Sequence, residues 1–308
     1  MPISSQPTLT PYIGRFAPSP SGPLHFGSLV TALASYLDAR ANGGKWLVRM
    51  EDLDPPREQP GAADDILKCL EGHSLYWDDE IMYQSKRHAA YQETLEALIK
   101  HGYVYPCGCS RQDLAGMSGI YDGRCRNRTV DLSQPHSLRL KLYDIPNYFH
   151  PEAIQFHDLI QGLQAQNLRT QAGDQILKRR DGFYAYQLAV VVDDIAQQIT
   201  HVIRGADLLE VTGRQLFCFD LLNAPQPAYG HVPLAVQVNG QKLSKQNHAK
   251  AIDTKHASRN LWHGLEFLGQ NPPPTLAASS THEILDWGLH NWRRDEIEGL
   301  SHLYPDNH

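Results

Sequence analysis

Residues 15–28 read RFAPSPSGPLHFGS, and the α/β character of the chain follows from this stretch and its neighbours. A short apolar segment with Ile13 and Phe16 runs into a loop rich in proline and glycine. Behind the loop, apolar residues recur at helical spacing: Leu29, Val30, Leu33, Ala34 and Leu37. Strand, tight loop and helix is the arrangement by which α/β proteins present backbone N–H groups to phosphate. The alternative is a proline-rich turn before an ordinary helix.

The glycines of this loop allow close approach of a ligand, and His25 and Ser28 add hydrogen-bond donors at the start of the helix. The loop has neither the Walker nor the dinucleotide glycine spacing, so another type of nucleotide site is predicted. A second, cationic stretch, KLSKQ, follows far downstream at residues 242–246. Two lysines that bracket a serine suit a polyphosphate, although lysines in loops are often only solvated.

Together and in this order, the two stretches resemble the signatures of class I aminoacyl-tRNA synthetases. The His-Ile-Gly-His element of that family reads HFGS at residues 25–28, and its Lys-Met-Ser-Lys-Ser element reads KLSKQ at residues 242–246. The preceding RFAPSPSG narrows the resemblance to the glutamyl branch. The resemblance implies an α/β fold with a Rossmann-like parallel sheet, an inserted zinc-bearing α/β lobe and a short helical C-terminal region.

The bulk composition is that of an ordinary soluble enzyme. The 308 residues suit one large domain with an insertion, or two modest domains. Hydrophobic residues make up 41% of the chain, yet no apolar run approaches the ~20 residues that span a bilayer. The first residues are polar and lack the pattern of a signal peptide. We therefore expect a cytoplasmic monomer without a membrane partner.

The formal net charge of −6 argues against a protein that coats nucleic acid without specificity. A transient RNA partner remains compatible with three local basic clusters, each of which can equally be a solvated surface. The clusters are Arg124, Arg126 and Arg128; Lys178, Arg179 and Arg180; and Arg293 with Arg294.

A buried strand is predicted over residues 45–50, and it ends at the acidic run Glu51-Asp52-Leu53-Asp54. Carboxylates at the carboxyl end of a strand lie where open α/β sheets bind ligands. The alternative is a charged turn before the two prolines that follow. Helices are predicted near residues 62–71 and 87–100.

Three of the five cysteines, Cys107, Cys109 and Cys125, lie within a short span, and an odd total disfavours a disulfide framework. Thiols this close in a reducing compartment indicate thiolate ligation of zinc. Spacing alone leaves the fourth ligand open among Asp113, Asp122, His101, His136 and Tyr121. The pattern resembles the zinc element of glutamyl synthetases, which implies one structural Zn²⁺ on Cys107, Cys109, Tyr121 and Cys125. Cys69 and Cys218 are expected in the core.

The second half of the chain alternates predicted strands and helices. Strand-like runs are found at residues 137–142 and 153–158, and the main fold is expected to resume with DGFYAYQLAVVVDD at residues 181–194. A strand is predicted over 199–204, and the short β-branched runs at 190–192 and 202–203 are typical of central parallel strands. A helix over 213–222 and a strand over 232–236 then lead to the lysine stretch.

Arg204 at the carboxyl end of a predicted strand can grip a carboxylate in bidentate geometry. The alternative is a surface ion pair. The resemblance implies that this arginine contacts substrate glutamate together with other positions that match the family. The implied glutamate-binding set is Arg15, Phe16, Ala17, Pro18, Ser19, Glu51, Tyr186 and Arg204.

The resemblance also assigns roles at the nucleotide. It implies ATP binding by His25, Gly27, Ser28 and Lys245, with His25, Lys242 and Lys245 as catalytic residues. Lys245 is expected to stabilise the departing pyrophosphate. Mg²⁺ is expected with ATP, held mainly by phosphates and water. Ser28 stands where many class I enzymes have a second histidine.

The predicted organisation has four units: the first half of the catalytic domain (1–102), the inserted acceptor-type lobe (103–180), the second half (181–250) and a C-terminal region (251–308). That last region shows helical patterns near residues 257–268, 282–291 and 295–303. Glutamyl synthetases that resemble this core carry a much longer C-terminal region that reads the anticodon. The chain is therefore expected to resemble the truncated branch, the glutamyl-queuosine tRNA(Asp) synthetases.

This resemblance implies tRNA-independent activation of L-glutamate by ATP, followed by transfer of glutamate to the queuosine base at the wobble position of tRNA(Asp). Without the resemblance, composition and spacing predict only an adenylate-forming enzyme that binds a nucleotide. Two other interpretations stay open: a minimal glutamyl ligase for another acceptor such as a tRNA 3′ end, and an inactive zinc-containing RNA-binding paralogue.

Overall fold

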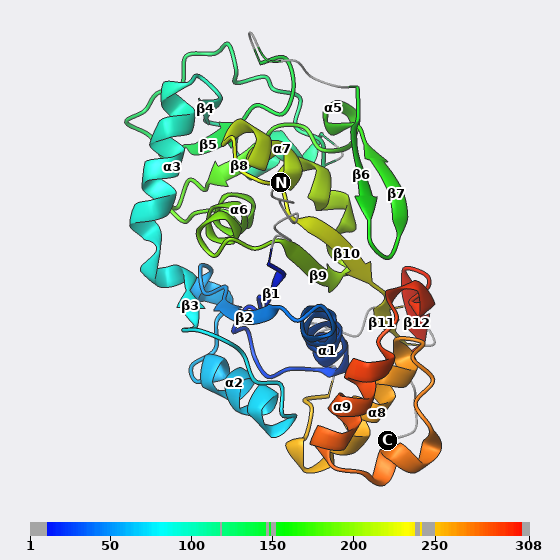
Figure 1. Cartoon of the computed structure of the whole chain (residues 1–308). Coiled ribbons are helices and arrows are strands. Elements are labelled where there is room, and N and C mark those ends of the chain that lie inside the picture. Colours follow the sequence, from blue (N-terminus) through cyan, green and yellow to red (C-terminus); the bar gives the residue numbers. More distant parts are fainter. Residues whose placement is uncertain are drawn as a thin grey trace, which may run out of the picture.

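The structure is a computed structural model, and it describes residues 11–117, 119–145, 148, 152–237, 241 and 250–303. At its centre lies a five-stranded sheet in the order β10–β9–β1–β2–β3 (Figure 1). Its strands are β1 (Ile13–Phe16), β2 (Lys45–Met50), β3 (Met82–Tyr83), β9 (His201–Gly205) and β10 (Ala228–Val232). All neighbouring strands are parallel, which confirms the predicted parallel sheet.

Helices cover both faces of this sheet. Trp46, Val48 and Met50 of β2 belong to a core shared with one group of helices, which contains α1 (Phe26–Ala41), α2 (Ala62–Gly72), α8 (Ala257–Phe267) and α9 (Thr281–Asn291). Leu47 points to the other face, because side chains alternate along a strand, and packs in a cluster with Leu216 of α7 (Thr212–Leu221). Figure 1 shows the two groups of helices on opposite sides of the sheet.

Between β3 and β9 the chain leaves the parallel sheet and forms two antiparallel sheets beyond α3 (His88–Lys100). One contains β4 (Val104–Cys107), β5 (Ser137–Leu140) and β8 (Gln175–Lys178). The other is the hairpin of β6 (Ile154–Asp158) and β7 (Gly162–Gln166). Short helices α4 (Arg111–Ala115) and α5 (Leu168–Gln171) complete this part.

The valine run at 190–192 is not a strand, so that prediction is wrong. It lies inside α6 (Tyr186–Ala196), in which every residue from Leu188 to Asp194 is buried. A helix that is buried on all sides shows no amphipathic period, and β-branched residues then imitate a central strand. The strand predicted at 199–204 is confirmed as β9.

The helix predicted at 295–303 is also wrong. After a short 3₁₀ turn (Arg294–Glu296) the chain extends into β12 (Ser301–Leu303), which pairs in parallel with β11 (Leu234–Val236). Gly299 has a φ of 72°, a left-handed conformation that interrupts a helix. The pairing partner is distant in sequence, so local periodicity could not reveal it.

Two further expectations concern the core and the membrane. Cys69 and Cys218 are buried, as predicted for core residues. Within the described part of the chain, no helix has the length and apolar character needed to cross a bilayer.

Candidate active site and cysteine cluster

The loop between β1 and α1 is fixed at both ends. His25 caps α1: its Nδ1 accepts a hydrogen bond from the Ser28 backbone N–H at 3.3 Å. With Nδ1 as an acceptor, Nε2 carries the ring proton and donates it to Ser28 Oγ at 3.1 Å. The Glu51 N–H donates to the Pro18 carbonyl at 3.0 Å, which holds the loop against the end of β2. The helix start is therefore preorganised with its N–H groups on the loop side.

A cavity of about 580 Å³ opens beside this loop. Of the eight residues predicted to bind glutamate, the cavity wall contains Arg15, Phe16, Ala17, Ser19, Glu51, Tyr186 and Arg204. They come from β1 and its loop, from the end of β2, from the start of α6 and from β9. Pro18, the eighth, does not line it, nor do His25, Gly27 and Ser28.

Asp194 of α6 forms ion pairs with two arginines, Arg15 in the cavity wall and the fully buried Arg49. Arg15 Nε lies 3.2 Å from Asp194 Oδ1, and Arg49 NH1 lies 2.6 Å from the same oxygen. Burial alone would raise the pKa of the Asp194 carboxyl, but the two guanidinium groups hold this pKa below its ordinary value. The network therefore fixes the orientation of Arg15 at the cavity wall.

Glu51 lies at the edge of the same network, with Oε1 3.3 Å from Arg49 NH2. Burial raises the pKa of Glu51 above its ordinary value, and the nearby Arg49 and Arg15 offset this only in part. Among the described residues the Glu51 carboxylate accepts a hydrogen bond from Arg49 alone, so it has capacity to accept a further donor. The ammonium group of an amino acid is such a donor.

Arg204 is held by five protein acceptors. Its Nε donates to His231 Nε2 at 3.0 Å, and its NH1 donates to Gln215 at 2.8 Å and to the Tyr186 hydroxyl at 3.5 Å. Its NH2 donates to Thr212 Oγ1 at 2.8 Å and to the Leu208 carbonyl at 3.2 Å. A guanidinium group has five N–H donors, so Arg204 enters the site as an immobilised charge and not as a mobile fork.

The two lysines predicted to act on ATP, Lys242 and Lys245, lie outside the described residues. Their roles and the ATP-binding roles of His25, Gly27 and Ser28 stay predictions. The loop of residues 17–25 joins the cavity to the start of α1.

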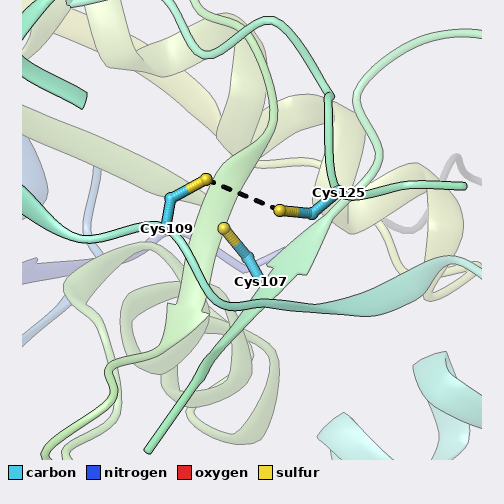
Figure 2. Close-up of side chains that lie close together, drawn as sticks. All are labelled: Cys107, Cys109 and Cys125. Carbon is cyan, nitrogen blue, oxygen red and sulfur yellow. Dashed lines mark hydrogen bonds between the residues drawn. The ribbon is translucent and has the colours of Figure 1, made fainter. Parts of the chain in front are cut away.

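Three thiols gather in the inserted part. The Sγ atoms of Cys107, Cys109 and Cys125 lie within 4.8 Å of one another, and Figure 2 shows the three sulfurs turned toward a common point. Cys109 and Cys125 approach to 3.5 Å between sulfurs. The cluster therefore suits a metal ion with a preference for thiolate ligands.

The Tyr121 hydroxyl joins this cluster at 3.3 Å from Cys107 Sγ and 3.8 Å from Cys109 Sγ. The other candidates for a fourth ligand have different partners among the described residues. The Asp113 carboxylate accepts from the Ser110 N–H, Asp122 pairs with Arg124, and His101 and His136 bond to the backbone carbonyls of Ala97 and Gln134. A set of three thiols and one phenol fits a four-coordinate ion.

Arg139 lies against this cluster, with its guanidinium carbon 3.8 Å from the centre of the Tyr121 ring. Burial raises the pKa of the Cys107 thiol, but hydrogen bonds from Tyr121, the Cys109 backbone and Arg139 outweigh it and lower this pKa overall. At Cys107 the surroundings therefore favour the thiolate, which is the form that binds metals, whereas burial and the hydrogen bond with Cys125 raise the pKa of the Cys109 thiol to about 11.

Most arginines of the three basic clusters are already paired. Arg124 pairs with Asp122, Arg126 with Asp174, and Arg179 with Asp181 and Asp54. Arg293 pairs with Asp295 and Glu296, and Arg294 with Asp38. These contacts favour the solvated or structural interpretation over an RNA patch.

Sequence analysis missed several residues that organise the site: Arg49, Asp158, Asp194, Gln215 and His231. The sequence does contain a signal for Asp194, because two adjacent carboxylates directly follow an apolar run. Buried carboxylates are unusual and need partners. His231 and Asp158 gave none, because each lies in an ordinary segment and only the fold brings them together.

Comparison with known proteins adds the family context. The sequence profile described as tRNA synthetases class I (E and Q), catalytic domain, matches residues 13–262. A protein of Vibrio parahaemolyticus named glutamyl-Q tRNA(Asp) synthetase is 47% identical over 294 residues, which are 96% of this chain and 97% of that protein. A protein of the same name from Ectopseudomonas mendocina is 50% identical over 283 residues, covering 92% and 94% of the two chains.

The fold is similar to a glutamate tRNA ligase from Elizabethkingia meningosepticum, whose crystal structure contains its amino acid. The TM-score is 0.80 at 24% identity, over 96% of this chain and 67% of that one. At this identity the likeness establishes the fold alone.

Proposed function

This chain belongs to the glutamyl-Q tRNA(Asp) synthetase family of class I tRNA synthetases, and from this we propose that it activates L-glutamate with ATP and transfers the glutamyl group to queuosine in tRNA(Asp). The observation that carries the proposal is the convergence of seven of the residues expected to bind glutamate on one cavity. A cytoplasmic monomer that acts without a membrane partner is part of the same proposal.

In the proposed binding mode, Arg204 and the Tyr186 hydroxyl face one carboxylate of the substrate, and Glu51 faces its ammonium group. Arg15 and Arg204 line the cavity and Asp194 orients Arg15, so the cavity presents two guanidinium groups to an anionic amino acid. Because these groups are already ordered, binding costs little side-chain entropy.

Activation joins a carboxylate oxygen of glutamate to the α-phosphorus of ATP, and the bond between that phosphorus and the bridging oxygen breaks. The products are glutamyl-adenylate and pyrophosphate. The residues proposed at the phosphates are His25, the N–H groups near Gly27 and Ser28, and Lys242 with Lys245. Catalysis of this kind is mostly positioning and charge stabilisation. When bound, Mg²⁺ neutralises phosphate charge.

Transfer then forms an ester: a hydroxyl of the cyclopentenediol in queuosine attacks the acyl carbon, AMP departs, and the hydroxyl proton passes to a phosphate oxygen or to water. Cys107, Cys109, Tyr121 and Cys125 are proposed to hold one Zn²⁺. That ion would supply a structural cross-link within the inserted part.

The test separates the two steps. Glutamate-dependent exchange of pyrophosphate into ATP is expected without tRNA, and labelled glutamate is expected on queuosine-containing tRNA(Asp) even after periodate has blocked its 3′ end. Arg204→Lys should abolish the exchange, since lysine cannot reproduce five directed N–H donors. Absence of exchange with Mg²⁺ and Zn²⁺ present would contradict catalysis. Label at the 3′ end would identify a minimal aminoacylating enzyme instead.

A further inference from the structure

A buried chain of three side chains ends at Arg204. Arg204 Nε donates to His231 Nε2 at 3.0 Å, and His231 Nδ1 lies 2.5 Å from Asp158 Oδ2. His231 and Asp158 are 0% exposed and Arg204 is 3% exposed. The three residues come from β10, from the end of β6 and from β9, so the chain connects the inserted hairpin with the cavity wall.

The Asp158 carboxylate is itself fixed in orientation. Its Oδ1 accepts the backbone N–H groups of Ile160 at 3.1 Å, Gln161 at 2.9 Å and His231 at 3.1 Å. Because all three groups are N–H donors, the atom that faces them must be an acceptor. The second oxygen, Oδ2, is thereby turned toward the imidazole ring of His231.

Each link dictates the proton position of the next. Arginine only donates, so His231 Nε2 must be the bare nitrogen that accepts. The ring proton then lies on Nδ1, where the Asp158 carboxylate accepts it. A doubly protonated ring would place the His231 Nε2–H against the Arg204 Nε–H, which are both donors. Burial also lowers the pKa of His231 and so favours the neutral ring.

We propose that Asp158 and His231 are positioning residues that fix the Nε side of Arg204, and so hold its guanidinium group at the place where it meets a substrate carboxylate. The inference rests on the proposed function, because it takes glutamate as the ligand of Arg204. It adds that the inserted hairpin helps to set glutamate affinity although it does not contribute a residue to the cavity wall.

The structure offers a substitution that inverts the proton pattern at constant shape. In Asp158→Asn the amide oxygen must face the three backbone N–H groups, so the amide NH₂ must face His231 Nδ1. The ring then accepts at Nδ1, carries its proton on Nε2, and opposes an N–H to Arg204 Nε–H. We expect the KM for glutamate in pyrophosphate exchange to rise roughly 10- to 100-fold, as for a buried donor left without an acceptor, with the KM for ATP nearly unchanged.

Two substitutions of His231 form a matched pair. A glutamine amide reaches the position of Nε2 and can accept from Arg204, whereas an asparagine amide reaches only the position of Nδ1. His231→Gln should therefore keep the KM for glutamate within about fivefold of the parent, and His231→Asn should match Asp158→Asn. Both remove the same ring, so a merely structural role would raise this KM equally in the two variants.

A spectroscopic readout accompanies the kinetics. With ¹⁵N-labelled histidine, the His231 ring, assigned by its disappearance in His231→Gln, should show a protonated Nδ1 in the parent and a protonated Nε2 in Asp158→Asn. An unchanged tautomer with an unchanged KM would overturn the inference, as would equal KM values in the two His231 variants. A parent protein without any exchange activity would instead refute the proposed function. If Asp158→Asn does not fold, the His231 pair decides.

Discussion

The substrate cavity and the cysteine cluster both collect polar side chains from distant segments, but they balance charge in different ways. At the cavity, Asp194 pairs with Arg15 and Arg49, and Arg204 donates to five acceptors, so these charged groups have partners within the protein. At the cluster, three thiols and a phenol meet one another. Neutral thiols and a phenol can share protons with one another, but as thiolates they gather negative charge at one point, so the cluster is suited to a cation. The comparison predicts that the two regions fail independently.

The largest effect is expected from loss of the Zn²⁺ ion that we propose for the cysteine cluster. Structural zinc contributes about 10–16 kcal/mol in small zinc peptides, so Cys125→Ser or chelation should unfold the surroundings of the cluster. Hydrogen exchange by mass spectrometry should show loss of protection in β4, β5 and β8 and retained protection in β1 and β2. Cys218→Ser, a buried cysteine outside the cluster, should leave zinc content unchanged. Uniform loss across both regions would contradict the comparison.

A smaller but global effect is expected at Asp194. Asp194→Asn leaves the buried Arg15 without its ion-pair partner and the buried Arg49 with Glu51 alone, which costs about 3–5 kcal/mol of the free energy of unfolding. Urea denaturation should measure the loss, with zinc content unchanged. The matched control is Asp79→Asn, which removes an exposed pair with Lys45 and should cost less than about 1 kcal/mol. Equal losses in the two variants would refute the assigned role of Asp194.

The identity of the fourth ligand can be tested by a substitution that removes a single oxygen atom, the hydroxyl of Tyr121. If the Tyr121 phenol binds the ion, Tyr121→Phe should weaken zinc binding by about 2–4 kcal/mol, one ligand's share of the total. Competition with a chromophoric chelator gives this value directly. Tyr143→Phe, a nearby tyrosine outside the cluster, serves as the control. Zinc affinity that does not change in Tyr121→Phe would assign the fourth position to another group.

The smallest effect is expected from pH. Burial lowers the pKa of His73, His201 and His231 in the folded state, so the unfolded state binds protons more readily. Stability should therefore fall as the pH drops through about 6.5, the ordinary histidine pKa. Glu51 has a raised pKa and acts with the opposite sign, so the Tm should be followed from pH 7.5 to 5.5 in Glu51→Gln. A flat or rising profile on acidification would contradict this.

Sequence patterns were enough to predict the site residues that lie in short contiguous stretches. The loop at 15–28, the strand ending at Glu51 and the cysteine spacing each carry their own signal, and the fold brings most of the named residues to one cavity and one cluster. Cysteine spacing alone left five candidates for the fourth ligand, the family resemblance implied Tyr121, and the fold places the Tyr121 hydroxyl beside the thiols.

Other features depend on tertiary context. Residues 190–192 lie in a helix whose amphipathic period is absent from the sequence because the helix is buried on all sides. Strand β12 forms because it pairs with the edge of β11, which is distant in sequence. Arg204 lies where the family resemblance implied, yet its occupied N–H groups follow from His231 and Asp158, which no local pattern connects. The two lysines predicted at 242 and 245 lie outside the described residues and keep the standing of a prediction.

The central strand β1 has one neighbour close in sequence and one very distant. Ile13 pairs with Lys45, whereas Gly14 pairs with His201. During synthesis, β1, β2 and β3 can associate while the other edge of β1 still waits for β9 to leave the ribosome. Until then the half-sheet presents an unpaired edge, a state prone to aggregation and slow to resolve because the missing contact is so non-local. Chaperone dependence during translation, more than instability of the finished enzyme, should limit its yield in cells.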